Sequence, residues 1–124
     1  MILLDYRDKR PIYEQVQEKL ERLITSGALE SDFKMPSVRS LAIELSVNPN
    51  TIQRAYTQLE QEGYIYTVSG RGSFVAPAEE WRDSKQKKLL NEWSELTIQV
   101  MESGITKERL LQKIEGIYKE ADND

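Results

Sequence analysis

The 124-residue sequence contains no cysteine and no histidine. These absences exclude disulfide bonds and thiolate ligands, and they remove the imidazole on which most zinc sites and many catalytic sites depend. No apolar run approaches the roughly 20 residues of a membrane-spanning helix, and the N-terminus is too short and too charged for a signal peptide. We therefore expect no cofactor, no metal, no membrane partner and a cytoplasmic location.

Acidic residues are in slight excess, and their placement matters more than their number. Residues 1–78 carry 9 Lys and Arg against 10 Asp and Glu, whereas residues 79–124 carry 8 against 11. No acidic residue lies between Glu44 and Glu60. A local face without acids decides whether a DNA phosphate can approach, although this pattern alone does not identify a nucleic-acid partner.

The first part of the chain reads as three helices followed by a hairpin. Apolar spacing predicts helices over residues 11–26, 38–45 and 49–61. Ser37 and Asn48 suit the N-caps of the second and third helices. β-Branched and aromatic residues at 64–68 and 73–75, around the turn residues 69–72, predict two paired strands. The expected core comprises Leu20, Leu41, Ile52, Leu59, Ile65 and Phe74.

This order of elements is that of a winged helix-turn-helix. In this fold the third helix enters the major groove of DNA by its N-terminal end. Its outward positions should then be polar and free of acids, as Asn50, Gln53, Arg54 and Thr57 are. Asparagine and glutamine can pair with adenine through two hydrogen bonds, and arginine with guanine. Each side chain alone would be an ordinary solvated surface residue, so the inference depends on their combination and order.

Four linked segments resemble the DNA-binding domain of the GntR family. They are residues 35–42 (MPSVRSLA), 47–56 (VNPNTIQRAY), 59–65 (LEQEGYI) and 70–75 (GRGSFV). The resemblance covers about residues 10–76. It implies DNA contacts by Arg39, Asn48, Asn50, Thr51, Gln53, Arg54, Ser69, Gly70 and Arg71. Pro49 and Gln53 stand where many members carry arginine, which implies less dependence on guanine at those two positions.

The remaining residues predict two helices, at about 79–102 and 107–121, separated by Ser103 and Gly104. Their apolar stripes are Leu89, Trp93, Leu96 and Val100, and Leu110, Ile114 and Ile117. The stripes can pack back on their own domain or pair with a second chain; two short helices bury little alone, which favours pairing. The short tail resembles that of the YtrA-type subfamily, whose members are homodimeric repressors. We therefore predict a DNA-binding domain at 1–78 and a dimerisation tail at 79–124.

The predicted function is a sequence-specific repressor that binds double-stranded DNA as a homodimer on a palindromic operator. The sequence names no effector. The alternative is a winged-helix module for protein–protein assembly, which salt-dependent DNA binding would distinguish. An enzyme is disfavoured because the carboxylate pairs Glu60/Glu62 and Glu79/Glu80 lie on polar faces. The segment Gly70–Ser73 also lacks the spacing and the lysine of a phosphate-binding loop.

Overall fold

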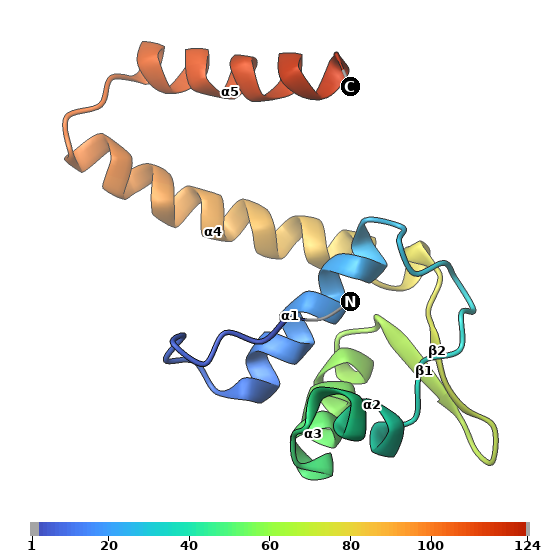
Figure 1. Cartoon of the computed structure of the whole chain (residues 1–124). Helices are drawn as coiled ribbons and strands as arrows, with labels where there is room; N and C mark the ends of the chain where they lie inside the picture. Colours follow the sequence, from blue (N-terminus) through green and yellow to red (C-terminus); the bar gives the residue numbers. More distant parts are fainter. Residues whose placement is uncertain (1–2, 124) are drawn as a thin grey trace. The chain divides into compact units, whose positions relative to one another are not determined.

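The computed structural model describes residues 3–123. In chain order the elements are α1 (Ile12–Thr25), α2 (Val38–Leu45), α3 (Pro49–Gln61), β1 (Ile65–Val68), β2 (Gly72–Val75), the 3-10 turn η1 (Ala78–Glu80), α4 (Arg82–Glu102) and α5 (Lys107–Asp122). The expected fold class is confirmed: a mostly helical chain with a two-stranded wing and two C-terminal helices (Figure 1). The chain divides into two compact units after Ser84.

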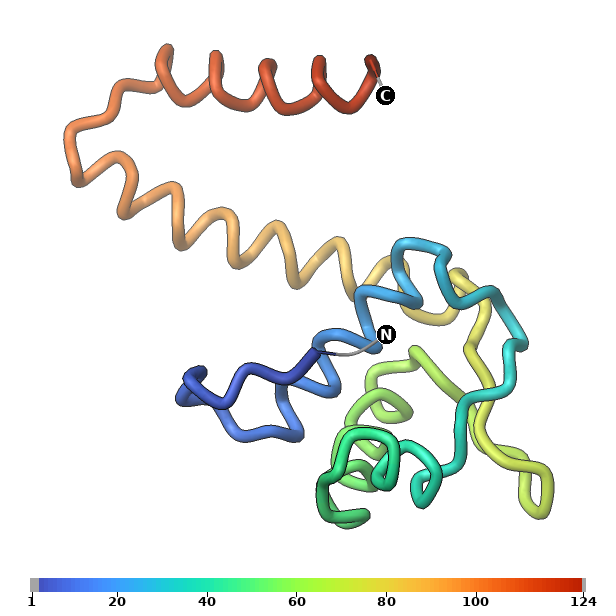
Figure 2. The backbone as a smooth tube through the Cα atoms, viewed as in Figure 1, coloured from blue at the N-terminus to red at the C-terminus, as the bar shows by residue number. Residues whose placement is uncertain are grey.

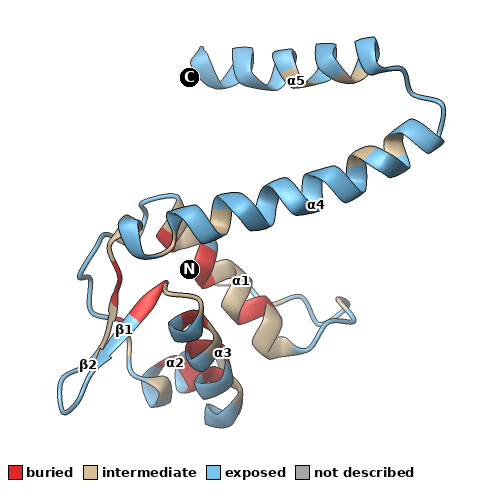
Figure 3. Ribbon diagram, turned by 180° about the vertical axis from the view of Figure 1, so that it is seen from behind, coloured by how far each residue is buried: buried red, intermediate tan, exposed pale blue. Residues whose placement is uncertain are grey.

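The first unit is built around α3. Helices α1 and α2 both pack against it. Val16, Leu20, Leu41, Ile52, Leu59 and Ile65 are among the buried residues that form one core. Figure 3 shows the buried positions gathered on the helices of this unit and at the start of β1. Five of the six predicted core residues are thus buried, and their removal from water supplies the main stabilisation of the unit.

Two side-chain caps set the helix-turn-helix. The Ser37 hydroxyl accepts a hydrogen bond from the Ser40 amide at 3.0 Å. The Asn48 side chain accepts one from the Asn50 amide at 2.8 Å. Both predicted caps are confirmed, and they satisfy amide groups that a helix start leaves unpaired. Between the helices Ser46 has a φ of 56°, the left-handed conformation that ends α2 and turns the chain toward α3.

The wing is an antiparallel pair in which Ile65 faces Val75 and Tyr66 faces Phe74. Since side chains alternate across a strand, only the first of these pairs points into the core. Ile65 and Val75 are buried, whereas Phe74 is half-buried and stacks on Tyr66 with ring centroids 5.6 Å apart. The prediction of Phe74 as a core residue was wrong because the register places it on the other face of the wing.

A connecting segment borders the second strand of the wing. The Asp32 amide donates to the Val75 carbonyl at 2.8 Å, and the Met35 amide donates to the Ser73 carbonyl at 2.8 Å. The Val75 amide donates back to the Phe33 carbonyl at 2.9 Å. Figure 2 shows this segment, between α1 and α2, running beside β2. The wing is therefore tied along one edge to the helical part of the unit.

The tail begins later than the sequence predicts. A helix was expected from residue 79, but residues 78–80 form a 3-10 turn and α4 starts at Arg82. Trp81 interrupts the helix with a φ of −129°, and its ring lies 5.5 Å from that of Tyr64. Trp81 packs against the core of the first unit. The first compact unit extends as far as Ser84.

The second unit holds most of α4 and all of α5. The Thr106 hydroxyl caps α5 by accepting from the Arg109 amide at 3.2 Å. Neither helix has a buried residue among those described, and Figure 3 shows both helices almost wholly exposed. In proteins most of the stability of a helix comes from packing of its apolar face against other elements. The second unit therefore lacks, within one chain, the apolar contacts that normally stabilise a helix pair.

Candidate nucleic-acid interface

The outward face of α3 is formed by Asn50, Gln53 and Thr57, which are all exposed. The Gln53 amide nitrogen lies 3.3 Å from the Thr57 hydroxyl, and that hydroxyl donates to the Gln53 carbonyl at 2.9 Å. The side chains of Gln53 and Thr57 therefore lie together along one face of the helix. This face offers amide and hydroxyl groups, the types that bond to base edges in the major groove.

The beginning of α3 carries no acidic residue in its first turn. Pro49 occupies the first helical position, where its missing N–H costs no hydrogen bond. The N-terminus of a helix carries a partial positive charge, which favours an approaching phosphate. The local electrostatics of this end therefore suit a polyanion, although the whole chain has a net charge of −4.

The structure places the ten predicted DNA-contact residues on the surface of the first unit. Arg39, Asn48, Asn50, Gln53, Arg54, Thr57, Ser69, Gly70 and Arg71 are exposed, and Thr51 is intermediate. They come from the start of α2, the Asn48 cap and the outward face of α3 as far as Thr57, and the tip of the wing. All are accessible in the single chain, as a binding surface requires.

Arg39 and Arg71 are exposed cations without an ion pair among residues 3–123. Two other arginines differ: Arg7 pairs with Asp5, and Arg10 pairs with Asp8 and Glu18. The hydrogen bonds from Arg10 lower the pKa of Asp8 below its ordinary value. Arg39 and Arg71 thus retain all their donors for a partner outside the chain, whereas Arg7 and Arg10 are already engaged with acids.

The wing tip is a tight turn between β1 and β2. The Arg71 amide donates to the Val68 carbonyl at 2.9 Å, and Gly70 has a φ of +78°. A residue with a side chain is strained at such a φ, which explains glycine at this position. The turn presents Arg71 at the end of the hairpin, where it can reach a surface beyond the helices.

Arg54 was predicted as a DNA contact, but its partner within the chain was missed. The guanidinium carbon of Arg54 lies 3.8 Å from the centre of the Tyr13 ring, a cation–π contact between α3 and the first turn of α1. Tyr13 lies in the helix that apolar spacing predicts over residues 11–26. It is half-buried, so one face of its ring remains available to a cation.

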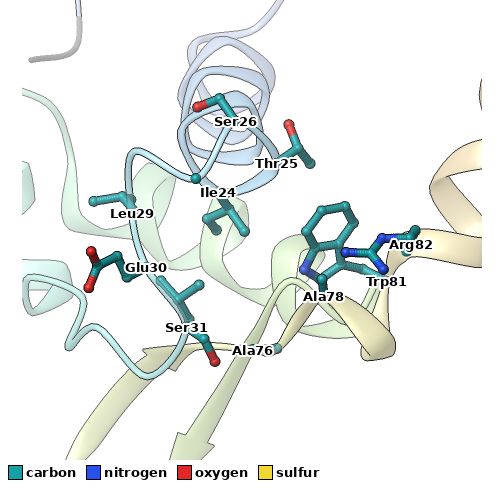
Figure 4. A pocket seen from close by; sticks show the side chains of 12 residues that line it. Ile24, Thr25, Ser26, Leu29, Glu30, Ser31, Ala76, Ala78, Trp81 and Arg82 are labelled. Atoms are coloured by element: carbon teal, nitrogen blue, oxygen red, sulfur yellow. The ribbon is translucent and has the colours of Figure 1, made fainter.

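The end of α1 and the residues around the start of α4 line an open pocket of about 360 Å³. Its lining includes Ile24, Leu29, Val75 and Trp81. Figure 4 shows the indole of Trp81 on one side of the pocket and the Ile24 side chain on the other. Through Trp81, the segment that leads into α4 is attached to the same core that holds α3.

An apolar groove of about 630 Å³ lies within the second unit. It is lined by Leu89, Leu90, Glu92, Trp93, Leu96, Ile114, Ile117 and Tyr118. The predicted stripe residues Leu89, Trp93, Leu96 and Ile117 are exposed, while Val100, Leu110 and Ile114 are intermediate. The groove therefore contains five of the seven predicted dimerisation residues and leaves them open to solvent in one chain.

The described residues hold neither a metal-ligand cluster nor a membrane-spanning helix. No cluster of three or more acidic, histidine or cysteine side chains within residues 3–123 has the arrangement needed to hold a metal ion. No helix in this part of the chain is long and apolar enough to cross a membrane.

Comparison with known proteins identifies the class. The family model described as "Bacterial regulatory proteins, gntR family" matches residues 12–75. The HTH-type transcriptional regulator YhcF of Bacillus subtilis is 40% identical over 88% of this chain and 91% of its own length. The HTH-type transcriptional repressor YtrA of the same organism is 34% identical over 94% and 92%. The protein is a transcriptional regulator and not an enzyme, and it belongs to the GntR family.

Solved structures agree with this placement. A GntR family transcriptional regulator from Listeria monocytogenes is 32% identical, with a TM-score of 0.77 over 91% of this chain and 98% of that one. The DNA-binding domain of AraR, solved in complex with the operator ORE1, is 33% identical with a TM-score of 0.53. It matches 61% of this chain and 93% of its own. The first unit therefore has the fold of a GntR DNA-binding domain.

Proposed function

We propose that this regulator is a repressor that binds a palindromic operator as a homodimer. One observation carries the DNA-binding part: the first half of α3 presents an exposed polar face without acids, beside a capped helix start. The AraR domain, which shares this fold, was solved bound to an operator. A regulator that acts on bacterial DNA works in the cytoplasm, where the chromosome is.

In the proposed complex α3 lies in the major groove. Asn50, Gln53 and Thr57 meet base edges, since they share the outward face of the helix. Arg39 and Arg71 meet the DNA from α2 and from the wing, because neither has an ion pair among the described residues. Asn48, Asn50 and Thr51 lie at the helix start, whose partial positive charge favours a phosphate.

Dimerisation through α4 and α5 is supported by their exposed apolar side chains. Leu96 is 58% exposed, Trp93 48% and Ile117 61%, in helices with no buried residue. Burying apolar surface gains about 25 cal/mol per Å². Contiguous apolar surface of this kind marks an interface in a soluble protein. We assign the groove between α4 and α5 to the helices of a second copy, which gives the two-fold symmetry of a palindrome.

Repression follows from occupancy: a dimer bound across a promoter blocks access by the polymerase. The sign of regulation is taken from YtrA, whose name describes a transcriptional repressor. An activator would instead raise transcription from the same site. A reporter gene placed behind the selected operator, with and without the protein, separates these two outcomes.

The test is selection of bound sequences from random DNA by the full chain, followed by footprinting and sedimentation of the complex. We expect a palindrome with half-sites about 10 bp, or one helical turn, apart and two chains on each site. Affinity should fall steeply as salt increases. Salt-insensitive binding without enrichment of any sequence would favour the alternative of a protein-assembly module. An asymmetric site occupied by one chain would contradict the homodimer.

A further inference from the structure

We propose that Tyr13 is a positioning residue for DNA binding and that Arg54, held on its ring, contacts a backbone phosphate rather than a base. This inference rests on the proposed function, since it concerns the same surface. The cation–π contact of 3.8 Å joins α1 to the first half of α3. It places a charged group at the edge of the face that meets the groove.

The position of Arg54 on the helix separates it from the base-reading side chains. At 100° per residue, Asn50 and Thr57 mark the centre of the outward face, and Gln53 and Arg54 lie toward its two edges. Gln53 is associated with Thr57, whereas Arg54 leans to α1. Bases line the floor of the major groove and phosphates line its rims. A guanidinium directed to the edge therefore meets a phosphate.

The chemistry of the contact leaves Arg54 competent to bind an anion. Its guanidinium lies over the ring face and makes no hydrogen bond or ion pair with another residue in 3–123. Glu14, the nearest acid in sequence to Tyr13, lies 3.3 Å from the Tyr13 hydroxyl and forms no ion pair with Arg54. The planar group keeps its donors for two parallel bonds to phosphate oxygens. Arg39 and Arg71 have no such support, so Arg54 is the preoriented cation of this surface.

The experiment is a double-mutant cycle in the full-length protein. Affinities are measured on the duplex selected by the wild type and on an unrelated duplex of equal length, over a range of salt. Arg54→Ala should weaken both duplexes equally and lower the salt slope by about 1. Tyr13→Leu should weaken both by about two- to five-fold, the size of an exposed cation–π contact. Tyr13→Phe, which keeps the ring, should stay near the wild type.

The decisive measurement is the DNA affinity of the double variant. Tyr13→Leu should cause no further loss of affinity when Arg54 has already been replaced by alanine. An equal loss in both backgrounds overturns the positioning role. A loss by Arg54→Ala confined to the selected duplex overturns the phosphate contact. Thermal unfolding checks each variant; if Tyr13→Leu does not fold, Tyr13→Met keeps the apolar volume without a ring. If the wild-type protein shows no salt-dependent binding to DNA, the proposed function is wrong as well. If DNA binding is salt-dependent but the effects of Tyr13→Leu and Arg54→Ala on affinity simply add, only the present inference is wrong.

Discussion

On the proposed DNA-binding surface, Gln53 and Arg39 offer two different chemistries. Gln53 carries an amide on the outward face of α3, where a donor and an acceptor can pair with adenine. Arg39 is an exposed cation on the first turn of α2, the helix that crosses the DNA backbone in the proposed complex. A base contact supplies discrimination, whereas a phosphate contact supplies affinity for every sequence. Substitution of each residue should therefore give a different pattern.

Gln53→Ala should cost about 1–3 kcal/mol on the selected operator and little on random DNA. Arg39→Ala should weaken binding to both and lower the salt slope by about 1, because one phosphate contact is lost. Fluorescence anisotropy on the two duplexes at several salt concentrations measures both effects. A uniform loss for Gln53→Ala would remove it from the base-reading set.

Tyr56 shows how a buried side chain joins two elements. Its hydroxyl donates to the Pro36 carbonyl at 2.6 Å, which ties α3 to the segment before α2. Burial raises the pKa of Tyr56 well above its ordinary value, because the charged form would lose its hydration. Tyr64 has a raised pKa for the same reason, with a hydrogen bond to Glu21 adding to it. The neutral phenol is thus favoured by folding.

The stabilisation from neutral Tyr56 is fully present below the unfolded pKa of about 10 and is lost as pH rises above it. Tyr56→Phe should lower the free energy of unfolding by about 1 kcal/mol at neutral pH, through the lost hydrogen bond. It should also reduce the fall in stability at alkaline pH, leaving the parts due to other groups such as Tyr64 and Tyr66, whose pKa values are also raised. Urea unfolding at pH 7 and above pH 10 measures both changes in the free energy of unfolding. If Tyr56→Phe lost as much stability above pH 10 as the wild type does, the raised pKa of Tyr56 would be contradicted.

At the scale of elements, the end of α3 is joined closely to the segment that leads into the tail. Gly63 follows α3 with a φ of +85°, and a Cβ there would lie 2.9 Å from the Glu80 carbonyl oxygen. The next residue, Tyr64, contacts Trp81. Gly27, which follows α1, has the same φ of +85° but nothing within 4 Å of its Cβ position. The two glycines therefore share the same backbone conformation and differ in the space available to a side chain, so comparing them isolates the effect of the Glu80 contact.

Gly27→Ala should destabilise the protein by about 1–2 kcal/mol, the cost of a side chain in the left-handed conformation. Gly63→Ala should cost clearly more, because the Glu80 backbone must also move. Urea unfolding of the two variants gives the comparison, and a change in tryptophan emission, to which Trp81 contributes beside Trp93, reports any release of the segment. Equal losses would show that the approach of Glu80 to Gly63 is not tight in solution.

The helices and their caps could be predicted because their signals are local. Ser37 and Asn48 cap helices as their residue types indicate. The half-buried state of Phe74 depends on the strand register, which the sequence leaves open by one residue. Trp81 lies where the tail helix is interrupted, and its ring contacts that of Tyr64. This contact joins residues distant in the sequence, so local patterns do not predict it. Gln15 was also missed: only 1% exposed, it bonds to the backbone of Asp5 through both amide atoms.

The surface exposure of the candidate DNA-contact residues was predictable, whereas their partners within the chain were not. Helical periodicity placed Asn50, Gln53 and Thr57 on one exposed face, and the structure agrees. The contact between Tyr13 and Arg54 joins residues about 40 positions apart, and no local pattern carries such information. Tyr13 has the spacing of an apolar residue in the first helix, and nothing in that spacing indicates its contact with Arg54.

At the scale of the whole molecule, two units with different surfaces have to act together. The first has its own core and exposes polar groups, while the second exposes apolar stripes and has no buried residue among those described. Two linked DNA-binding units gain affinity because the second half-site is met at a high effective concentration. Dimerisation through the tail would therefore control operator binding without any change in α3.

Leu96→Glu is expected to separate the dimer. A carboxylate in the proposed apolar interface would be buried without a partner, which is strongly unfavourable. The first unit should stay folded, because its core is untouched. Gln99→Glu is the matched control: it adds the same charge to the same helix, outside the stripe of Leu89, Trp93, Leu96 and Val100.

Sedimentation should show a Leu96→Glu monomer, with Trp93 emission shifted to the red as its ring meets water. Operator affinity should collapse, since a single half-site loses the gain from the linked pair. Gln99→Glu should keep the mass, the emission and the affinity of the wild type. A Leu96→Glu protein that remains dimeric would show that the tail packs elsewhere. A monomer with full affinity would show instead that dimerisation is no part of operator binding, because each α3 would then find its half-site alone.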